Sequence, residues 1–283
     1  MKNILILTDF SETAENASKA ALWLAGRTHS DLLLYNSFIK YPTIATYAGS
    51  SWKVDECIER KDRSKEELKF LRERLNLTED HSVAGLRKPV IHISSEDNDL
   101  GSAVTKLTNE NDIELIVMGA RNPEGKPGLF GRDINSVIET TTCPVLILPV
   151  NSSIKNISRI FFASDYGDGD IVALNYLSRF AELLNCELEI VHVDDNEERN
   201  ASVNKKMKRF EEVLASTKFS NLKQNVLNGK NVVSRINRLL NSNEDMLAMA
   251  HKQQSFCTRF FHDSTVKEAV DNQKAPLFIF PLI

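Results

Sequence analysis

The chain has 283 residues, of which 42% are hydrophobic and 26% charged, and this length suits two domains that each bury a core. A net charge of −4 gives no electrostatic basis for binding nucleic acid, and no apolar run approaches the roughly 18 residues of a membrane span. The 4 cysteines are scattered without metal-ligand spacing and the first residues do not resemble a signal peptide, so we expect a soluble protein with reduced thiols in the cytoplasm.

The first half of the chain alternates short apolar runs with segments of helical periodicity. Alternation of this kind predicts an α/β fold in which the strands are parallel and the helices form right-handed crossovers. Ser11 or Asp9 is placed to cap the first helix. The predicted strands are residues 3–8, 32–35, 89–93, 115–118 and 143–149, and the predicted helices are residues 12–28, 62–75, 100–107 and 133–142.

The same order of segments recurs in the second half. A repeating unit of roughly 140 residues is too long for a solenoid and predicts a tandem duplication of one domain. We therefore expect domains at residues 1–150 and 151–283, joined by the polar linker 151–153. The matching segments are 159–166 with 3–10, 188–193 with the second strand, 205–214 with 62–75, 245–250 with 114–119, and 275–281 with 143–149.

A glycine-rich segment separates the predicted strand 115–118 from the helix that begins near Asp133. Backbone amides between a parallel strand and a helix N-terminus are typical of phosphate sites, because glycine allows close approach and the helix dipole favours an anion. Loops after parallel strands are also glycine-rich for turn geometry alone, so both interpretations stand at this point. The glycines are Gly119, Gly125, Gly128 and Gly131.

Three segments of the first half, residues 4–12, 117–119 and 143–146, occur at separations that the second half repeats. With these segments the chain resembles the universal stress protein family in its tandem two-domain form, over essentially its whole length. The resemblance implies two five-stranded parallel-sheet domains of the adenine-nucleotide α-hydrolase-like (Rossmann-like) type. It also implies association through the last strand of each domain, which in tandem forms joins the two halves of one chain.

Nucleotide-binding members of that family carry glycine, two residues, glycine, nine residues, and then glycine followed by serine or threonine. An alternative alignment puts Asn135 and Ser136 at the last pair, but it shortens the following helix by about one turn. In the alignment we prefer, Gly119 takes the first place, Asn122 the second with Gly125 nearby, and Gly131 with Arg132 the last pair.

One residue departs from the family pattern, and its neighbour opposes the binding of phosphate. Arg132 stands where a hydroxyl is expected, and it can replace that donor with charge-assisted hydrogen bonds to phosphate. The alternative is a solvated arginine on the first helical turn, where its charge opposes the helix dipole. Asp133 on the same turn would repel a phosphate.

The resemblance further implies an adenine site at the carboxyl ends of the strands, the usual ligand crevice of such a sheet. Asp9, next to Thr8, would accept a hydrogen bond from the adenine amino group, and the backbone at Ser37 would complete the adenine contacts. Met118 ends the strand that leads into Gly119. The alternative role for Asp9 is that of a helix cap.

The corresponding segment of the second half, residues 250–264, contains no glycine, so we expect no nucleotide there. Because this twin folds without glycine, we attribute the glycines of the first half to ligand approach rather than to folding. We expect Phe256, Phe260 and Phe261 to form an interface, and we favour a structural role over a metal site for His251, Cys257 and His262.

The sequence thus predicts a cytoplasmic universal stress protein that binds ATP or another adenine nucleotide, with Mg²⁺ as its companion, in the N-terminal domain. The C-terminal domain would serve structure or association, with residues 145–148 and 277–280 pairing edge to edge in an intrachain pseudo-dimer or a homodimer. No catalytic motif is present, although slow ATP hydrolysis stays open. The alternative is a stress protein that binds another small metabolite or a protein partner.

Overall fold

The computed structural model describes residues 2–38, 51–78, 87–120, 130–194, 201–216, 219–229, 232–240, 243–252, 269–270 and 275–282. The chain divides into two compact units, Met1–Val145 and Leu146–Ile283, which we call unit 1 and unit 2.

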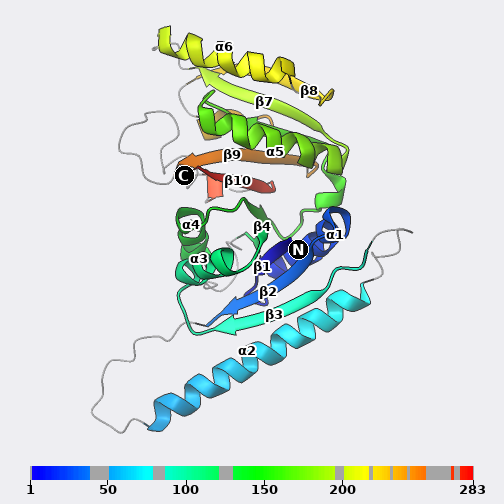
Figure 1. Ribbon diagram of the computed structural model, residues 1–283, viewed down its shortest axis with the longest axis vertical. Coiled ribbons are helices and arrows are strands. Elements are labelled where there is room, and N and C mark those ends of the chain that lie inside the picture. Colours follow the sequence, from blue (N-terminus) through cyan, green and yellow to red (C-terminus); the bar gives the residue numbers. More distant parts are fainter. Residues whose placement is uncertain are drawn as a thin grey trace. The chain divides into compact units, whose positions relative to one another are not determined.

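Unit 1 is a parallel α/β fold, as predicted. Its strands follow the order β3-β2-β1-β4, and β5, at the boundary of the units, continues it. The pairings of β1 with β2, β1 with β4, and β2 with β3 are all parallel. The elements are β1 Asn3–Leu7, α1 Glu12–Thr28, β2 Asp31–Ser37, α2 Ser51–Leu77, β3 Ile91–Glu96, α3 Leu100–Glu110, β4 Ile113–Gly119, α4 Phe130–Thr140 and β5 Val145–Leu148 (Figure 1).

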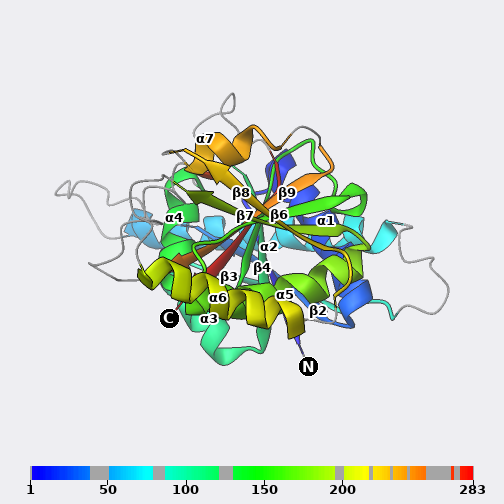
Figure 2. The same cartoon turned by 90° about the horizontal axis from the view of Figure 1, so that it is seen from above.

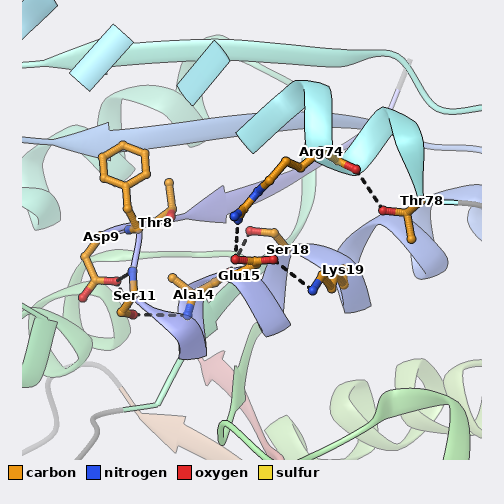
Figure 3. A network of polar contacts seen from close by, with 10 residues as sticks. Thr8, Asp9, Ser11, Ala14, Glu15, Ser18, Lys19, Arg74 and Thr78 are labelled. Carbon is orange, nitrogen blue, oxygen red and sulfur yellow. Dashed lines mark hydrogen bonds and ion pairs between the residues drawn. The ribbon is translucent and has the colours of Figure 1, made fainter. Parts of the chain in front are cut away.

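The helices of unit 1 cover its sheet in two pairs. The chain moves from β1 through β2 to β3 in one direction and returns to β4, so right-handed crossovers place α1 and α2 on one face and α3 and α4 on the other. On the first face, Glu15 of α1 binds Arg74 of α2 and Lys19 of its own helix (Figure 3). Burial alone would raise the pKa of Glu15, but the hydrogen bonds from Lys19 and Arg74 outweigh it and lower that pKa.

Unit 2 repeats this arrangement, with the strand order β10-β9-β6-β7-β8 and parallel pairings throughout. Seen from above, α5 and α6 lie on one side of β6, β7 and β8, and α7 lies on the other (Figure 2). The elements are the 3-10 helix Ile154–Asn156, β6 Arg159–Ala163, α5 Asp168–Leu184, β7 Glu187–Asp194, α6 Ala201–Ser216, β8 Leu222–Asn228, α7 Val232–Asn237, β9 Asp245–Lys252 and β10 Leu277–Leu282.

The duplication extends to single backbone angles. Phe10 and Tyr166, which follow the first strand of each unit, have φ of 63° and 60°. His29 and Asn185, which end the first helix of each unit, have φ of 56° and 54°. Positive φ is uncommon outside glycine, so its recurrence at two matched places confirms the internal repeat.

Several predicted boundaries and elements differ from the structure. The helix 12–28 is found as predicted, but α2 is longer than 62–75 and α4 begins at Phe130 rather than at Asp133. Gly131 therefore lies within the first turn of α4 and not before the helix. Among the described residues, none of the helices combines the length and the apolar character that crossing a membrane would take.

Candidate functional site

The carboxyl ends of β1, β2 and β4 meet at one edge of unit 1. Leu7, the last residue of β1, pairs with Tyr35 of β2 on one side and with Met118 of β4 on the other. Thr8 and Asp9 therefore lie between the end of β2 and Gly119. The chain reverses its direction across the sheet between β1 and β4, which is where open α/β sheets bind ligands.

The turn from β1 into α1 is fixed by its own side chains (Figure 3). The Thr8 hydroxyl accepts a hydrogen bond from the Phe10 amide at 3.0 Å, which supports the positive φ of Phe10. The Ser11 hydroxyl accepts the amide of Ala14 at 3.3 Å and caps α1. Asp9 holds this cap in place, because its Oδ1 accepts both the Ser11 amide at 3.0 Å and the Ser11 hydroxyl.

Asp9 therefore stabilises the helix cap with one carboxylate oxygen and leaves the other oxygen as an unused acceptor. Its Oδ2 has no hydrogen-bond partner in the part of the chain that the structure describes. The side chain is half-buried, so this oxygen is open to a ligand donor. The two roles predicted for Asp9, ligand acceptor and contributor to the cap, are compatible with one another.

A hydrogen-bond network that joins β1, β2 and α2 was not predicted from the sequence. The Asn36 amide group donates to the Thr8 carbonyl oxygen at 2.7 Å, and the Ser64 hydroxyl of α2 donates to Asn36 Oδ1 at 2.8 Å. In unit 2, His192 occupies the same place and its Nδ1 donates to the Ser164 carbonyl oxygen at 2.8 Å. A polar residue at matched positions of two buried strands was the signal available.

Ser37 and Met118 are held by the protein itself. The Ser37 hydroxyl donates to the carbonyl oxygen of Asn98 in the loop before α3. Met118 is 1% exposed and Thr8 is 0% exposed, so their side chains belong to the core and only their backbone can face a ligand. Ser37 is partly exposed at the end of β2, and the backbone contact expected of it stays a prediction.

Gly119 has a packing role that corrects our attribution of the glycines to ligand approach. A Cβ at Gly119 would lie 2.7 Å from the carbonyl carbon of Thr13 and 2.8 Å from the amide nitrogen of Ala14. Both are backbone atoms of the first turn of α1, so no side-chain rotation relieves the overlap. The absence of a Cβ is demanded by the contact of α1 with β4, whatever else Gly119 does.

Comparison with known proteins decides the family. The family described as Usp: Universal stress protein family matches residues 1–149. The chain belongs to the universal stress protein family. None of the curated proteins matches the chain.

Two solved structures that cover nearly the whole chain share the fold of this universal stress protein. A universal stress protein from Archaeoglobus fulgidus DSM 4304 is 16% identical with a TM-score of 0.68, covering 99% of this chain and 98% of that one. A functionally unknown protein from Pseudomonas aeruginosa PAO1 is 14% identical with a TM-score of 0.57, covering 99% and 92%. A universal stress protein solved in complex with cAMP is 16% identical with a TM-score of 0.35, covering 52% and 96%.

The remaining predicted site residues follow β4. Asn122 and Gly125 lie outside the described residues. Gly131, Arg132 and Asp133 lie on the first turn of α4. The alternative alignment makes Ser136 the phosphate ligand, but its hydroxyl lies against α3, where a Cβ at Gly101 would come within 2.4 Å of it.

The second unit of this universal stress protein differs at the matching edge. His251 is 5% exposed and buried at the end of β9, whereas the predicted interface and metal candidates Phe256, Cys257, Phe260, Phe261 and His262 lie outside the described residues. Within the described ranges, no three histidine, cysteine or acidic residues are grouped so as to hold a metal ion.

Proposed function

We propose that unit 1 binds an adenine nucleotide, ATP or AMP, at the carboxyl edge of β1, β2 and β4. The observation that carries the proposal is the state of Asp9. One carboxylate oxygen is committed to Ser11, and the other is open at the point where the strand order reverses. An adenine amino group is a donor that suits this oxygen, and the backbone at Ser37 lies on the neighbouring strand.

The phosphates would extend toward α4. Amides of its first turn, at Gly131 and Arg132, provide donors at a helix N-terminus, where the dipole favours an anion. The Arg132 guanidinium would take the place of the family's hydroxyl, with Asn122 and Gly125 in the loop before it. Asp133 opposes a bare phosphate, which favours a nucleotide that brings Mg²⁺ with it.

Unit 2 serves structure and association in this proposal. Its segment after β9 lacks glycine, and a buried acidic side chain, Asp170, occupies the place that Ala14 holds in unit 1. The amides of Asp165 and Gly167 already donate to Asp170, so they are not available to an anionic ligand. We further propose that β5 and β10 mediate self-association, in one chain or between two, which analytical ultracentrifugation distinguishes.

A thermal-shift titration tests the nucleotide site. A ligand that binds only the folded state stabilises it by about 2.7 kcal/mol at a hundred times its dissociation constant. ATP and AMP should raise the unfolding temperature of the parent, and Gly131→Val should abolish the rise by placing a side chain at the phosphate end. Asp165→Asn, in unit 2, is the control variant and should keep the nucleotide-induced rise in unfolding temperature. No shift of the parent at millimolar nucleotide would refute the proposal.

One observation favours a second candidate, a site for a different small anionic metabolite. Arg132 replaces the family's serine or threonine, and guanidinium pairs as readily with a carboxylate as with a phosphate. The two candidates differ in what the purified protein carries. Chromatography of the supernatant after denaturation would show an adenine nucleotide under the first proposal and a non-nucleotide acid under the second.

A further inference from the structure

The first turn of α5 in unit 2 buries an aspartate that the proposed function does not use. Asp170 is 3% exposed, and its Oδ2 accepts three hydrogen bonds. The donors are the Ser164 hydroxyl at 2.7 Å, the Asp165 amide at 2.9 Å and the Gly167 amide at 3.2 Å. All three belong to the turn between β6 and α5, so this carboxyl group ties the turn together.

A second carboxyl group lies against the first. The Gly167 amide donates both to Asp165 Oδ1 at 3.0 Å and to Asp170 Oδ2 at 3.2 Å, so the two carboxyl groups converge on one donor. Two ionised carboxylates held this close repel each other, and a proton on one of them relieves the repulsion. Unit 1 has Asp9 at the place of Asp165 but Ala14 at the place of Asp170, so the pair is confined to unit 2.

Opposing effects act on the Asp170 carboxyl group. Its three donors and the N-terminus of α5 favour the ionised form. Burial, followed by the charge of Asp165, favours the neutral form and prevails, raising the pKa of Asp170 to about 7. The donors are a hydroxyl and two amides, so none of them brings a compensating positive charge.

We propose that the turn between β6 and α5 is a proton-dependent switch, in which Asp170 holds a proton beside the Asp165 carboxylate and releases it as the pH rises through neutrality. Loss of the proton leaves two carboxylates in contact inside the fold. Their repulsion loosens the first turn of α5 and the residues that Ser164 holds. Near-neutral pH thereby controls the order of this edge of unit 2.

The switch reaches three strands through Tyr166. The Ser164 hydroxyl that donates to Asp170 also accepts the Tyr166 amide at 3.0 Å. The Tyr166 ring stacks on His192 of β7 with 4.4 Å between ring centroids, and Gln224 of β8 donates to its hydroxyl at 3.1 Å. Movement of Ser164 therefore displaces an aromatic ring that joins β6, β7 and β8.

The other charged groups around the turn are engaged elsewhere or lie on neighbouring elements. Asp168 at the start of α5 pairs with Arg209 of α6 at 2.6 Å, which keeps that cation on the outer side of the helix. Glu211 of α6 and Asp194 of β7 act on Tyr166. In the described part of unit 2, the titratable and charged groups on the turn and on the elements around it are Asp165, Asp168, His192, Asp194, Arg209, Glu211 and His251.

The sign of the pH effect follows from linkage. The folded state binds the Asp170 proton more tightly than the unfolded chain does, because the pKa of Asp170 is raised on folding. The stabilisation is therefore complete below the ordinary pKa of aspartate and is lost as the pH rises toward 7 and above.

Hydrogen exchange of the full chain at several pH values between 5 and 9, corrected for intrinsic rates, tests the switch. Protection of the α5 amides should fall at least tenfold across this range, whereas α1, which has Ala14 at the matched position, serves as the internal control and should not follow. Asp170→Asn keeps an acceptor oxygen and should make α5 protection independent of pH.

Asp165→Asn provides a second arm that does not depend on the stability of the Asp170 variant. Removing the neighbouring charge should move the midpoint of the α5 transition to lower pH. Parallel pH profiles of α5 and α1 in the parent would overturn the proposal, and so would an Asp165→Asn midpoint equal to that of the parent.

Discussion

Adding a methyl group at two glycines of unit 1 should change its stability in opposite directions. A Cβ at Gly119 would lie 2.7 Å and 2.8 Å from backbone atoms of α1, closer than real Cβ atoms come. At Gly26, in the last turn of α1, a Cβ would meet nothing within 4 Å. The same substitution, glycine to alanine, therefore tests packing at one site and backbone propensity at the other.

The two magnitudes follow from different effects. Overpacking costs about 1–3 kcal/mol, and the overlap at Gly119 is with backbone, so the gain of about 0.4–1 kcal/mol from restricting the unfolded chain is outweighed. We expect Gly119→Ala to destabilise unit 1 by about 2 kcal/mol. Gly26→Ala should stabilise it by about 0.5–1 kcal/mol, since alanine is the better helix former.

Urea denaturation followed by tryptophan fluorescence measures both variants. The 2 tryptophans, Trp23 and Trp52, both belong to unit 1, so this signal reports that unit alone. With a urea dependence of about 2 kcal/mol per molar, Gly119→Ala should lower the midpoint by about 1 M. A midpoint for Gly119→Ala equal to or above that of the parent would refute the packing role.

Three further substitutions test unit 1 by the same assay. Ser11→Ala removes the cap of α1 and should cost about 1 kcal/mol, so an unchanged midpoint would count against the cap. Burial alone would raise the pKa of Asp31, but the Val90 amide and the Arg87 guanidinium outweigh it and lower that pKa. Stability should therefore fall as the pH drops through the folded pKa, and Asp31→Asn should lessen this acid sensitivity; parallel profiles between pH 7 and pH 3 would contradict it. The Tyr35 hydroxyl is buried without a hydrogen-bond partner among the described residues, so Tyr35→Phe should stabilise unit 1 by about 1 kcal/mol, and a loss of stability would contradict that.

Much of the fold was predictable because its signals are local. The helix 12–28 shows small apolar residues at helical spacing after a capping serine, and the structure places α1 at these residues. The strand β8 was not predicted, since most of its residues are polar and several are exposed, so no apolar periodicity marks it. An edge strand of this kind is identified by the neighbour with which it pairs, here β7, and not by its own residues.

The candidate site was predictable only in part, because its contacts join distant segments. The roles of Asp9 and Ser11 follow from their adjacency, whereas the bond from Asn36 to the Thr8 carbonyl oxygen spans 28 residues. Gly119 shows a further limit. The sequence shows that Gly119 lacks a Cβ but not which atoms lie where a Cβ would be. Because the repeat has Ala250 at this position, we attributed Gly119 to ligand approach and not to packing against α1.

The most direct test of the nucleotide proposal is the preference of the site for adenine over guanine. In Asp9→Asn, the oxygen that accepts from Ser11 can be kept while the open acceptor becomes an amide donor. By calorimetry, the variant should bind ATP at least tenfold more weakly than the parent, in line with a charged hydrogen bond of about 1.5–3 kcal/mol. It should also lose the preference for ATP over GTP, because an amide donor matches the guanine oxygen. Equal ATP affinity in the parent and in Asp9→Asn would contradict the account.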